Sequence, residues 1–244
     1  FGNSSLVSNT FKPGLFDINL QVKTRNGCSD EINKPELIKV FDTIPSNTTL
    51  NRVTVLNDHE VLIEWQKNVD IAFSHHILYR KSSLDSSFSA IKTFKNQDEI
   101  FFVDKNLNTI DLIYCYKIVS VDKCGQQLKL YEVPFHCTIN VASKKLSENS
   151  IKVEWSRYEG SPVDYYEVYR QDKTSNTNQL IATVTSTTLE LIDTSAYCNY
   201  EYSYKVKANG PRGLLEGSMS DTSQVKMDGI SHLQKSEIIR ATVE

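Results

Sequence analysis

The side chains in this sequence that could do chemistry are histidines, cysteines and carboxylates, and their spacing decides whether they can act together. His75 and His76 form the one histidine pair, while His59, His136 and His232 are isolated. Adjacent residues of a strand point to opposite faces, so the paired imidazoles cannot readily share a metal ion. The pattern therefore favours a structural role for the pair.

Five cysteines are spread along the chain: Cys28, Cys115, Cys124, Cys137 and Cys198. No two form a CxxC motif, and apart from the neighbours His136 and Cys137 they are not grouped with histidines. A nucleophilic cysteine needs a base and a group that orients the base, and the sequence offers neither. Structural or free thiols are expected, and an oxidising compartment outside the cytoplasm fits this pattern best. The odd number leaves at least one cysteine without a partner in this chain.

Acidic residues such as Asp58, Glu60, Asp104 and Asp193 fall at expected strand ends and turns, where Asp commonly accepts hydrogen bonds from the backbone. No Asp-x-Asp-x-Asp-Gly pattern for calcium occurs. With no nucleophile–base, paired-acid or metal-ligand pattern, we expect no catalytic residues, no metal, no cofactor and no enzymatic activity.

Composition narrows the class of protein. The chain of 244 residues has a formal net charge of −3, with 39% hydrophobic and 23% charged residues. This charge gives no reason to expect nucleic acid as a partner. No apolar run approaches the roughly 20 residues of a membrane helix, so membrane insertion is not expected. Short alternating segments rich in Thr, Val, Ile and Tyr predict β-structure throughout.

A short segment occurs twice: "EVLIEW" at 60–65 and "SIKVEW" at 150–155. Side chains alternate along a strand, so Val61, Ile63 and Trp65 should share one face. Ile151, Val153 and Trp155 should do the same in the second copy. We therefore predict that each segment is a core strand anchored by its Trp.

Other segments repeat at about the same distance. Tyr79-Arg80 is answered by Tyr169-Arg170, Asp104 by Asp193, and "YCYKIVSVDKCG" by "YSYKVKANGPRG". Each copy contains five or more short strands in about ninety residues, which is typical of a β-sandwich. The sequence thus predicts an all-β chain of tandem sandwiches.

The order Trp, Tyr-Arg, Tyr-x-Tyr-x-(Ile/Val) and a turn with Gly resembles the fibronectin type III domain, an immunoglobulin-like sandwich. The resemblance covers residues 46–137 and 138–228. It implies that Tyr114 and Tyr202 are tyrosine-corner residues, whose hydroxyls bond to nearby backbone. It says little about function, because this scaffold serves many roles.

Two local features of these domains suggest specific contacts. A hairpin centred near Gly125 would bring Cys115 close to Cys137, which makes a disulfide between them geometrically feasible. In the second domain, Arg212, Leu214 and Leu215 follow "NGP" in the expected loop between the last two strands. They form a candidate contact loop, although a plain turn is the simpler interpretation.

Residues 1–45 resemble the C-terminal half of a PKD domain, so a partial PKD-like sandwich is expected at the N-terminus. Phe1-Gly2-Asn3, Phe11, Phe16 and Gly27-Cys28 stand at its motif positions, with Phe in place of both tyrosines. A strand over 16–22, a turn at Gly27 and a return strand over 37–44 are expected. Residues 229–244 are expected to be a linker and the first strand of a truncated third fibronectin-like domain, because Arg240–Val243 copies Arg52–Val55.

PKD followed by fibronectin-like domains resembles surface proteins of Bacteroidota, many of them exported by the type IX secretion system. The function expected is a non-catalytic extracellular spacer or binding segment of a large cell-surface protein, related to adhesion or gliding motility. Its partners would be adjacent domains of the same long chain, another surface or secretion-system protein, or a glycan. Two alternatives stay open: accessory modules of a secreted polysaccharide-degrading enzyme, and a eukaryotic receptor ectodomain, which the absence of a WSxWS motif disfavours.

Overall fold

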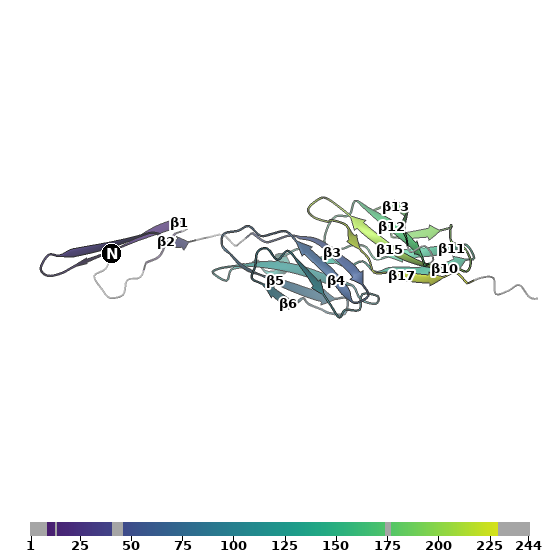
Figure 1. Ribbon diagram of the computed structural model, residues 1–244, viewed down its shortest axis with the longest axis horizontal. Helices are drawn as coiled ribbons and strands as arrows, with labels where there is room; N and C mark the ends of the chain where they lie inside the picture. Colours follow the sequence, from purple (N-terminus) through teal and green to yellow (C-terminus); the bar gives the residue numbers. More distant parts are fainter. Residues whose placement is uncertain (1–8, 13, 41–45, 174–176, 229–244) are drawn as a thin grey trace, which may run out of the picture. The chain divides into compact units, whose positions relative to one another are not determined.

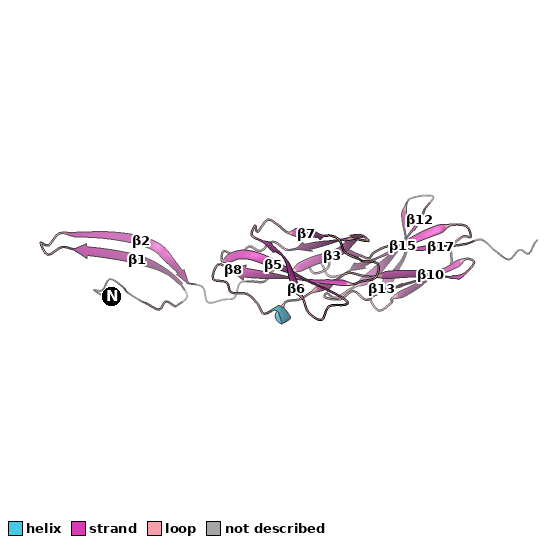
Figure 2. Cartoon of the chain, turned by 90° about the horizontal axis from the view of Figure 1, so that it is seen from below, coloured by secondary structure: helices cyan, strands magenta, loops and turns pink. Residues whose placement is uncertain are grey.

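A computed structural model of the chain describes residues 9–12, 14–40, 46–173 and 177–228. It divides into two compact units, residues 1–45 and 46–244. The chain is all-β: across the described ranges the single helical element is a 3-10 turn, η1 (Leu130–Glu132), drawn in cyan in Figure 2. The expected third-domain strand at Arg240–Val243 lies outside the described residues.

The first unit contains one antiparallel pair, β1 (Gly14–Lys23) and β2 (Ser29–Val40), joined by a turn at Gly27 (Figure 1). The return strand begins at Ser29 and not at Leu37 as expected, because its polar first half continues the register with β1. Apolar side chains of this pair stay exposed, with Leu20 at 57% and Ile32 at 48%. Two strands alone cannot enclose a core.

The second unit holds two sandwiches, which we call the first sandwich (46–137) and the second sandwich (138–228). In the first sandwich a three-stranded sheet faces a four-stranded one, and all neighbours are antiparallel. The sheets have the orders β3 (Leu50–Asn57), β4 (Glu60–Trp65), β7 (Phe101–Asp104) and β6 (Ser89–Phe94), β5 (Phe73–Ser82), β8 (Tyr114–Asp122), β9 (His136–Cys137).

The second sandwich repeats this order. Its sheets are β10 (Val141–Ser147), β11 (Ser150–Trp155), β14 (Glu190–Asp193) and β13 (Asn178–Thr185), β12 (Tyr165–Asp172), β15 (Glu201–Asn209), β16 (Ser218–Met219), with β17 (Ser223–Lys226) also on β15. The final strand is split at Ser220 and Asp221. Ser220 bonds Val206 of β15 partly through its hydroxyl, and the Asp221 carboxylate accepts from Val141 N of β10. The expected tandem sandwiches are thus present (Figure 1).

Each sandwich has its own core, filled by the residues that the alternation placed inward. Trp65 is 1% exposed and packs on Phe94, while Trp155 is 6% exposed and packs edge-on against Tyr166. Burial of so large a side chain contributes a few kcal/mol, at about 25 cal/mol per Å² of apolar area. The two Trp residues therefore hold equivalent places in two separate cores.

Candidate functional site

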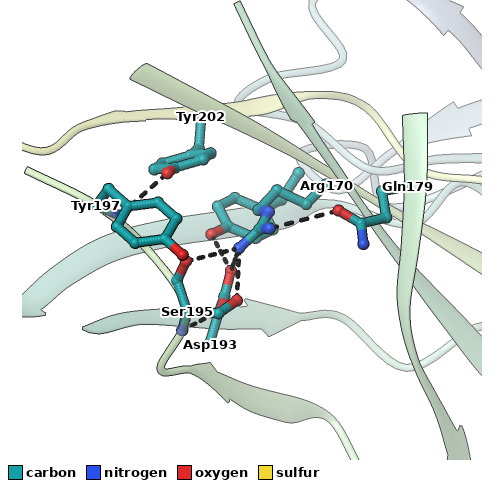
Figure 3. Close-up of polar contacts among 7 residues, drawn as sticks. Arg170, Gln179, Asp193, Ser195, Tyr197 and Tyr202 are labelled. Atoms are coloured by element: carbon teal, nitrogen blue, oxygen red, sulfur yellow. Dashed lines mark hydrogen bonds and ion pairs between the residues drawn. The ribbon is translucent and has the colours of Figure 1, made fainter. Parts of the chain in front are cut away.

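The repeated Tyr-Arg and Asp positions meet in the second sandwich as a charged cluster on β12, β14 and β15 (Figure 3). Arg170 Nη1 lies 2.8 Å from Asp193 Oδ2, and the Tyr204 hydroxyl donates to the same oxygen at 2.8 Å. Ser195 donates to Asp193 Oδ1 from both its backbone N and its hydroxyl. Every acceptor position of this carboxylate is thereby used within the protein.

The electrostatics of this cluster indicate a structural role. Burial alone would raise the pKa of Asp193, but hydrogen bonds from Ser195, Tyr204 and Arg170 outweigh burial and lower the pKa. The carboxylate therefore stays ionised and paired, whereas a general acid would need a raised pKa. Burial beside this charge raises the pKa of Tyr204. The cluster ties three strands together.

The first sandwich carries the same cluster at the same strand positions. Arg80 Nη1 lies 2.8 Å from Asp104 Oδ2, to which the Tyr116 hydroxyl donates at 3.0 Å. Within the described residues Asp104 has no hydrogen bonds like those from Ser195, and its side chain is more exposed than that of Asp193, 10% against 4%. The second cluster is therefore the more enclosed of the two.

The two expected tyrosine-corner residues are both buried, and each hydroxyl accepts a hydrogen bond from backbone. Tyr114 accepts from Asn108 N at 3.1 Å, and Tyr202 from Tyr197 N at 3.0 Å. Each ring also lies near its sandwich's arginine, with Arg170 Cζ 5.1 Å from the Tyr202 centroid. These tyrosines therefore hold the loop before the strand against the charged cluster.

A disulfide joins Cys115 on β8 to Cys137 on β9, directly opposite each other in the register. The remaining cysteines, Cys28, Cys124 and Cys198, are free thiols. The cross-strand bond fixes the two-residue β9 to its neighbour, at the point where the chain leaves the first sandwich.

A chain of buried hydrogen bonds crosses the junction between the two sandwiches. We define this junction as residues 136–140, 158–160 and 213–219 with the facing part of β3. Val53 N donates to Ser218 Oγ at 3.4 Å, and Ser218 Oγ donates to the Tyr158 hydroxyl at 3.2 Å. The Tyr158 hydroxyl lies 2.6 Å from His136 Nδ1. Burial lowers the pKa of His136 to about 4, so its neutral ring can accept this bond.

Backbone contact at the junction is equally close. Cys137 N donates to the Glu159 carbonyl at 3.0 Å. Gly160 has a φ of +114°, and a Cβ at this position would lie 1.7 Å from the Phe135 carbonyl oxygen. Larger residues cannot fit there unless the backbone moves. The three-residue connection 138–140 adds Asn140, whose Nδ2 donates to Ile110 O in the first sandwich and to Asp221 Oδ2 in the second.

The candidate contact loop takes part in this junction. Gln66 Nε2 donates to Gly213 O at 3.0 Å, and Glu216 N donates to Asn51 O at 3.0 Å. Arg212 and Leu214 are exposed, but Leu215 is 2% exposed and packs in the core of the second sandwich. Leu215 therefore cannot serve as a surface contact, because the turn at Pro211 directs its side chain inward.

In the ranges that the structure describes, no group of three or more His, Cys, Asp or Glu side chains is placed to hold a metal ion. His75 and His76 diverge as expected: His75 is half-exposed, while His76 is buried against Trp65 and Phe73. Among the described residues, no helix is long and apolar enough to cross a membrane.

Comparisons with known proteins find solved structures of similar fold. No family model matches the chain, and no curated protein matches it. Similar solved structures include a two-domain fibronectin type III segment of chicken tenascin, at 15% identity, TM-score 0.32, 74% of this chain and 98% of that one. The central fibronectin-III array of RIM-binding protein matches at 14% identity, TM-score 0.34, 77% of this chain and 70% of that one.

Pectate lyase Pel3 from Pectobacterium carotovorum matches a smaller part, at 18% identity, TM-score 0.32, 39% of this chain and 28% of that one. Because all these TM-scores are low, the fold assignment rests on the strand order and register described above. The junction residues His136, Tyr158 and Gly160 were not predicted as functional, since neither their types nor their spacing distinguishes them from ordinary loop residues.

Proposed function

We propose that this chain is a non-catalytic extracellular segment of a large surface protein, in which the two sandwiches act as one stiff spacer that presents neighbouring domains. The junction carries this proposal. Hydrogen bonds from β3, the 138–140 connection and the 213–219 loop cross from one sandwich to the other. A three-residue connection with a hydrogen-bonded interface limits bending more than a flexible linker would.

The extracellular location is supported by chemistry and by the architecture. The Cys115–Cys137 disulfide suits an oxidising compartment, because such bonds are rare in the cytosol. Independent cores in tandem suit an extended surface protein, since each domain can fold by itself. In the second sandwich both carboxylate oxygens of Asp193 are hydrogen-bonded within the protein, which fits a structural scaffold better than a reaction centre.

A finer assignment follows from the sequence resemblance. We propose that residues 1–45 are the C-terminal half of a PKD-like domain and that the whole protein is a Bacteroidota surface protein exported by the type IX system, for adhesion or gliding motility. Phe11, Phe16 and Gly27-Cys28 support the PKD part, and the Phe11 and Phe16 rings lie 4.8 Å apart. Antibody and protease accessibility on intact cells would test the location, and an intracellular protein would contradict it.

The spacer is tested by nitrogen-15 relaxation on the full chain. We expect the two sandwiches to tumble with one correlation time. Gly160→Ala should separate them, because its Cβ would collide with the Phe135 carbonyl. Gly125→Ala is the matched control: it also has positive φ, but its Cβ would meet nothing within 4 Å. Independent tumbling of the two sandwiches in the unmodified chain would contradict the proposal.

A further inference from the structure

A cationic groove crosses the junction of the two sandwiches. It has a volume of about 330 Å³ and is lined by Arg52 of β3 and by Lys205 and Lys207 of β15, with no acidic residue among its lining residues. This volume is near the lower end of roughly 300–1,000 Å³ for small-ligand pockets. The groove therefore suits a compact ligand that carries negative charge.

One of the three cations is uncompensated. Arg52 forms an ion pair with Glu64, and Lys207 lies 3.2 Å from Glu167. Lys205 forms no ion pair within the part of the chain that the structure describes. The charge of Lys205 acts on Asp221 at longer range, but that carboxylate is buried, at 3% exposed, and forms no ion pair with it. An anion in the groove would thus meet a free ammonium group.

The equivalent lysine of the first sandwich shows what a purely structural lysine looks like here. Lys117 pairs with Tyr79 across the sheet as Lys205 pairs with Tyr169. Its Nζ lies 4.9 Å from the Phe88 ring centroid and donates to Leu130 O at 2.6 Å, and the residue is 7% exposed. Lys205 has no such cover and is half-exposed. The same sheet position is closed in one sandwich and open to a ligand in the other.

The neutral residues of the groove indicate the body of the ligand. Tyr169 offers an aromatic surface, and its hydroxyl is held by Glu167 Oε2 at 3.1 Å, which fixes the ring. Met219 adds apolar area. Thr54 Oγ1 accepts from Met219 N, so its own hydrogen is available to donate, and Asn178 adds an amide. An apolar surface beside hydroxyl and amide groups suits a sugar ring with several hydroxyls.

We propose that this groove binds an acidic saccharide, with its carboxylate or sulfate on Lys205 and Lys207 and its ring against Tyr169. The compact cluster of cations favours a sugar of one or two rings over an extended acidic peptide, which would need a longer stripe of positive charge. The proposal goes beyond the spacer function, because spacing requires no ligand.

The test is a titration of the full nitrogen-15-labelled chain, followed through amide shifts of residues 169, 205 and 219. A galacturonic acid disaccharide supplies the carboxylate, a sulfated disaccharide supplies the sulfate, and maltose is the neutral control. We expect one of the acidic sugars to shift these amides and maltose to leave them unchanged. Lys205→Gln should weaken the binding at least about fivefold, as loss of a charged hydrogen-bond partner implies. Lys92→Gln, an exposed lysine on β6, should leave it unchanged.

Inorganic sulfate and a hexa-aspartate peptide complete the experiment. Sulfate binding as tight as that of the sugars, or a preference for the peptide, would overturn the saccharide assignment. Absence of shifts with both acidic sugars, or equal loss in Lys92→Gln, would overturn the site. None of these results changes the tumbling experiment, so the groove and the spacer can fail separately.

Discussion

The first and second sandwiches have separate cores built on the same pattern, but they differ on the outer face of the sheet that contains β8 in the first and β15 in the second. Along β8 every residue is buried, whereas along β15 burial alternates with half-exposure. The segment between β8 and β9 accounts for part of this difference, since Leu130 O binds Lys117 and Phe135 lies beside the same ammonium group. In the second sandwich the corresponding segment turns toward β3 and leaves the face open.

This difference shows which parts of the scaffold are constrained. The inward residues and the Arg–Asp–Tyr clusters recur because each sandwich must fill a core and pair a buried charge. The outer face has no such requirement, so one copy can close it with Phe88 and Phe135 while the other presents Lys205 and Lys207. The disulfide lies in the first sandwich, whose outer face is covered, and the groove lies on the exposed outer face of the second sandwich.

The largest expected effect tests whether the two cores are independent. Trp155→Ala should lower the free energy of unfolding of the second sandwich by about 3–5 kcal/mol, through lost burial and the cavity left behind. Because the cores are separate, the second sandwich should melt first. Differential scanning calorimetry with residue-resolved NMR would follow both.

Trp65→Ala is the matched variant and should reverse the order of melting. A single cooperative transition, shifted equally by either substitution, would show that the sandwiches unfold as one body. That result would replace the picture of two cores joined at a junction.

The fold was predictable because its signal is local and repeated. Alternation in "EVLIEW" and "SIKVEW" is enough to assign inward faces, and Trp65 and Trp155 lie where that alternation places them. The start of β2 was not predictable in the same way. Residues 29–36 are polar apart from Ile32 and Pro35 and carry no alternation, and their pairing with β1 is what makes them a strand.

The junction and the groove depend on contacts between distant residues, which no short pattern records. Gly160 is required because the Phe135 carbonyl is next to it, yet the sequence shows an ordinary glycine in a loop. Lys205 and Arg52 are separated by more than a domain length in sequence and meet because β3 packs against β16, the neighbour of β15 in its sheet. The sequence suggested Leu215 as a surface contact because no local pattern records the turn at Pro211, which directs the Leu215 side chain into the core.

The next prediction concerns the Cys115–Cys137 disulfide of the first sandwich. The disulfide closes a loop of 22 residues, and loss of such a constraint on the unfolded chain destabilises by about 3 kcal/mol. The double variant Cys115→Ser, Cys137→Ser should therefore lower the melting temperature of the first sandwich and leave the second unchanged. Thermal melts with and without reductant give the same comparison on the unmodified protein. An equal shift of both sandwiches would mean that β9 stabilises the second through the junction.

Acid should affect the two sandwiches in opposite directions. In the first, burial lowers the pKa of His76 to about 4, from 6.5 when unfolded, with a contribution from the charge of His75. The unfolded chain then binds the extra proton, so stability is lost as pH falls below 6.5. Between pH 7 and 5 the loss is about 2 kcal/mol. Burial lowers the pKa of His136 in the same direction. The equivalent position in the second sandwich is Tyr166, which carries no such proton.

In the second sandwich the controlling group is Asp221, whose pKa burial raises to about 7, from 3.8 when unfolded, against a hydrogen bond from Val141 N. Here the folded chain binds the extra proton, so stability is present at low pH and is lost as pH rises through 7. Acidification from pH 7 to 5 should therefore add about 2 kcal/mol. Asp193 does not oppose this change, because its lowered pKa keeps it ionised over the whole interval.

Urea unfolding followed by residue-resolved NMR at the two pH values measures both sandwiches in one sample. His76→Phe should remove part of the acid loss in the first sandwich, and Asp221→Asn should abolish the acid gain in the second. Loss of stability in both sandwiches on acidification would show that the buried Asp221 is paired in solution, and the contrast between the two copies would then be confined to their outer faces.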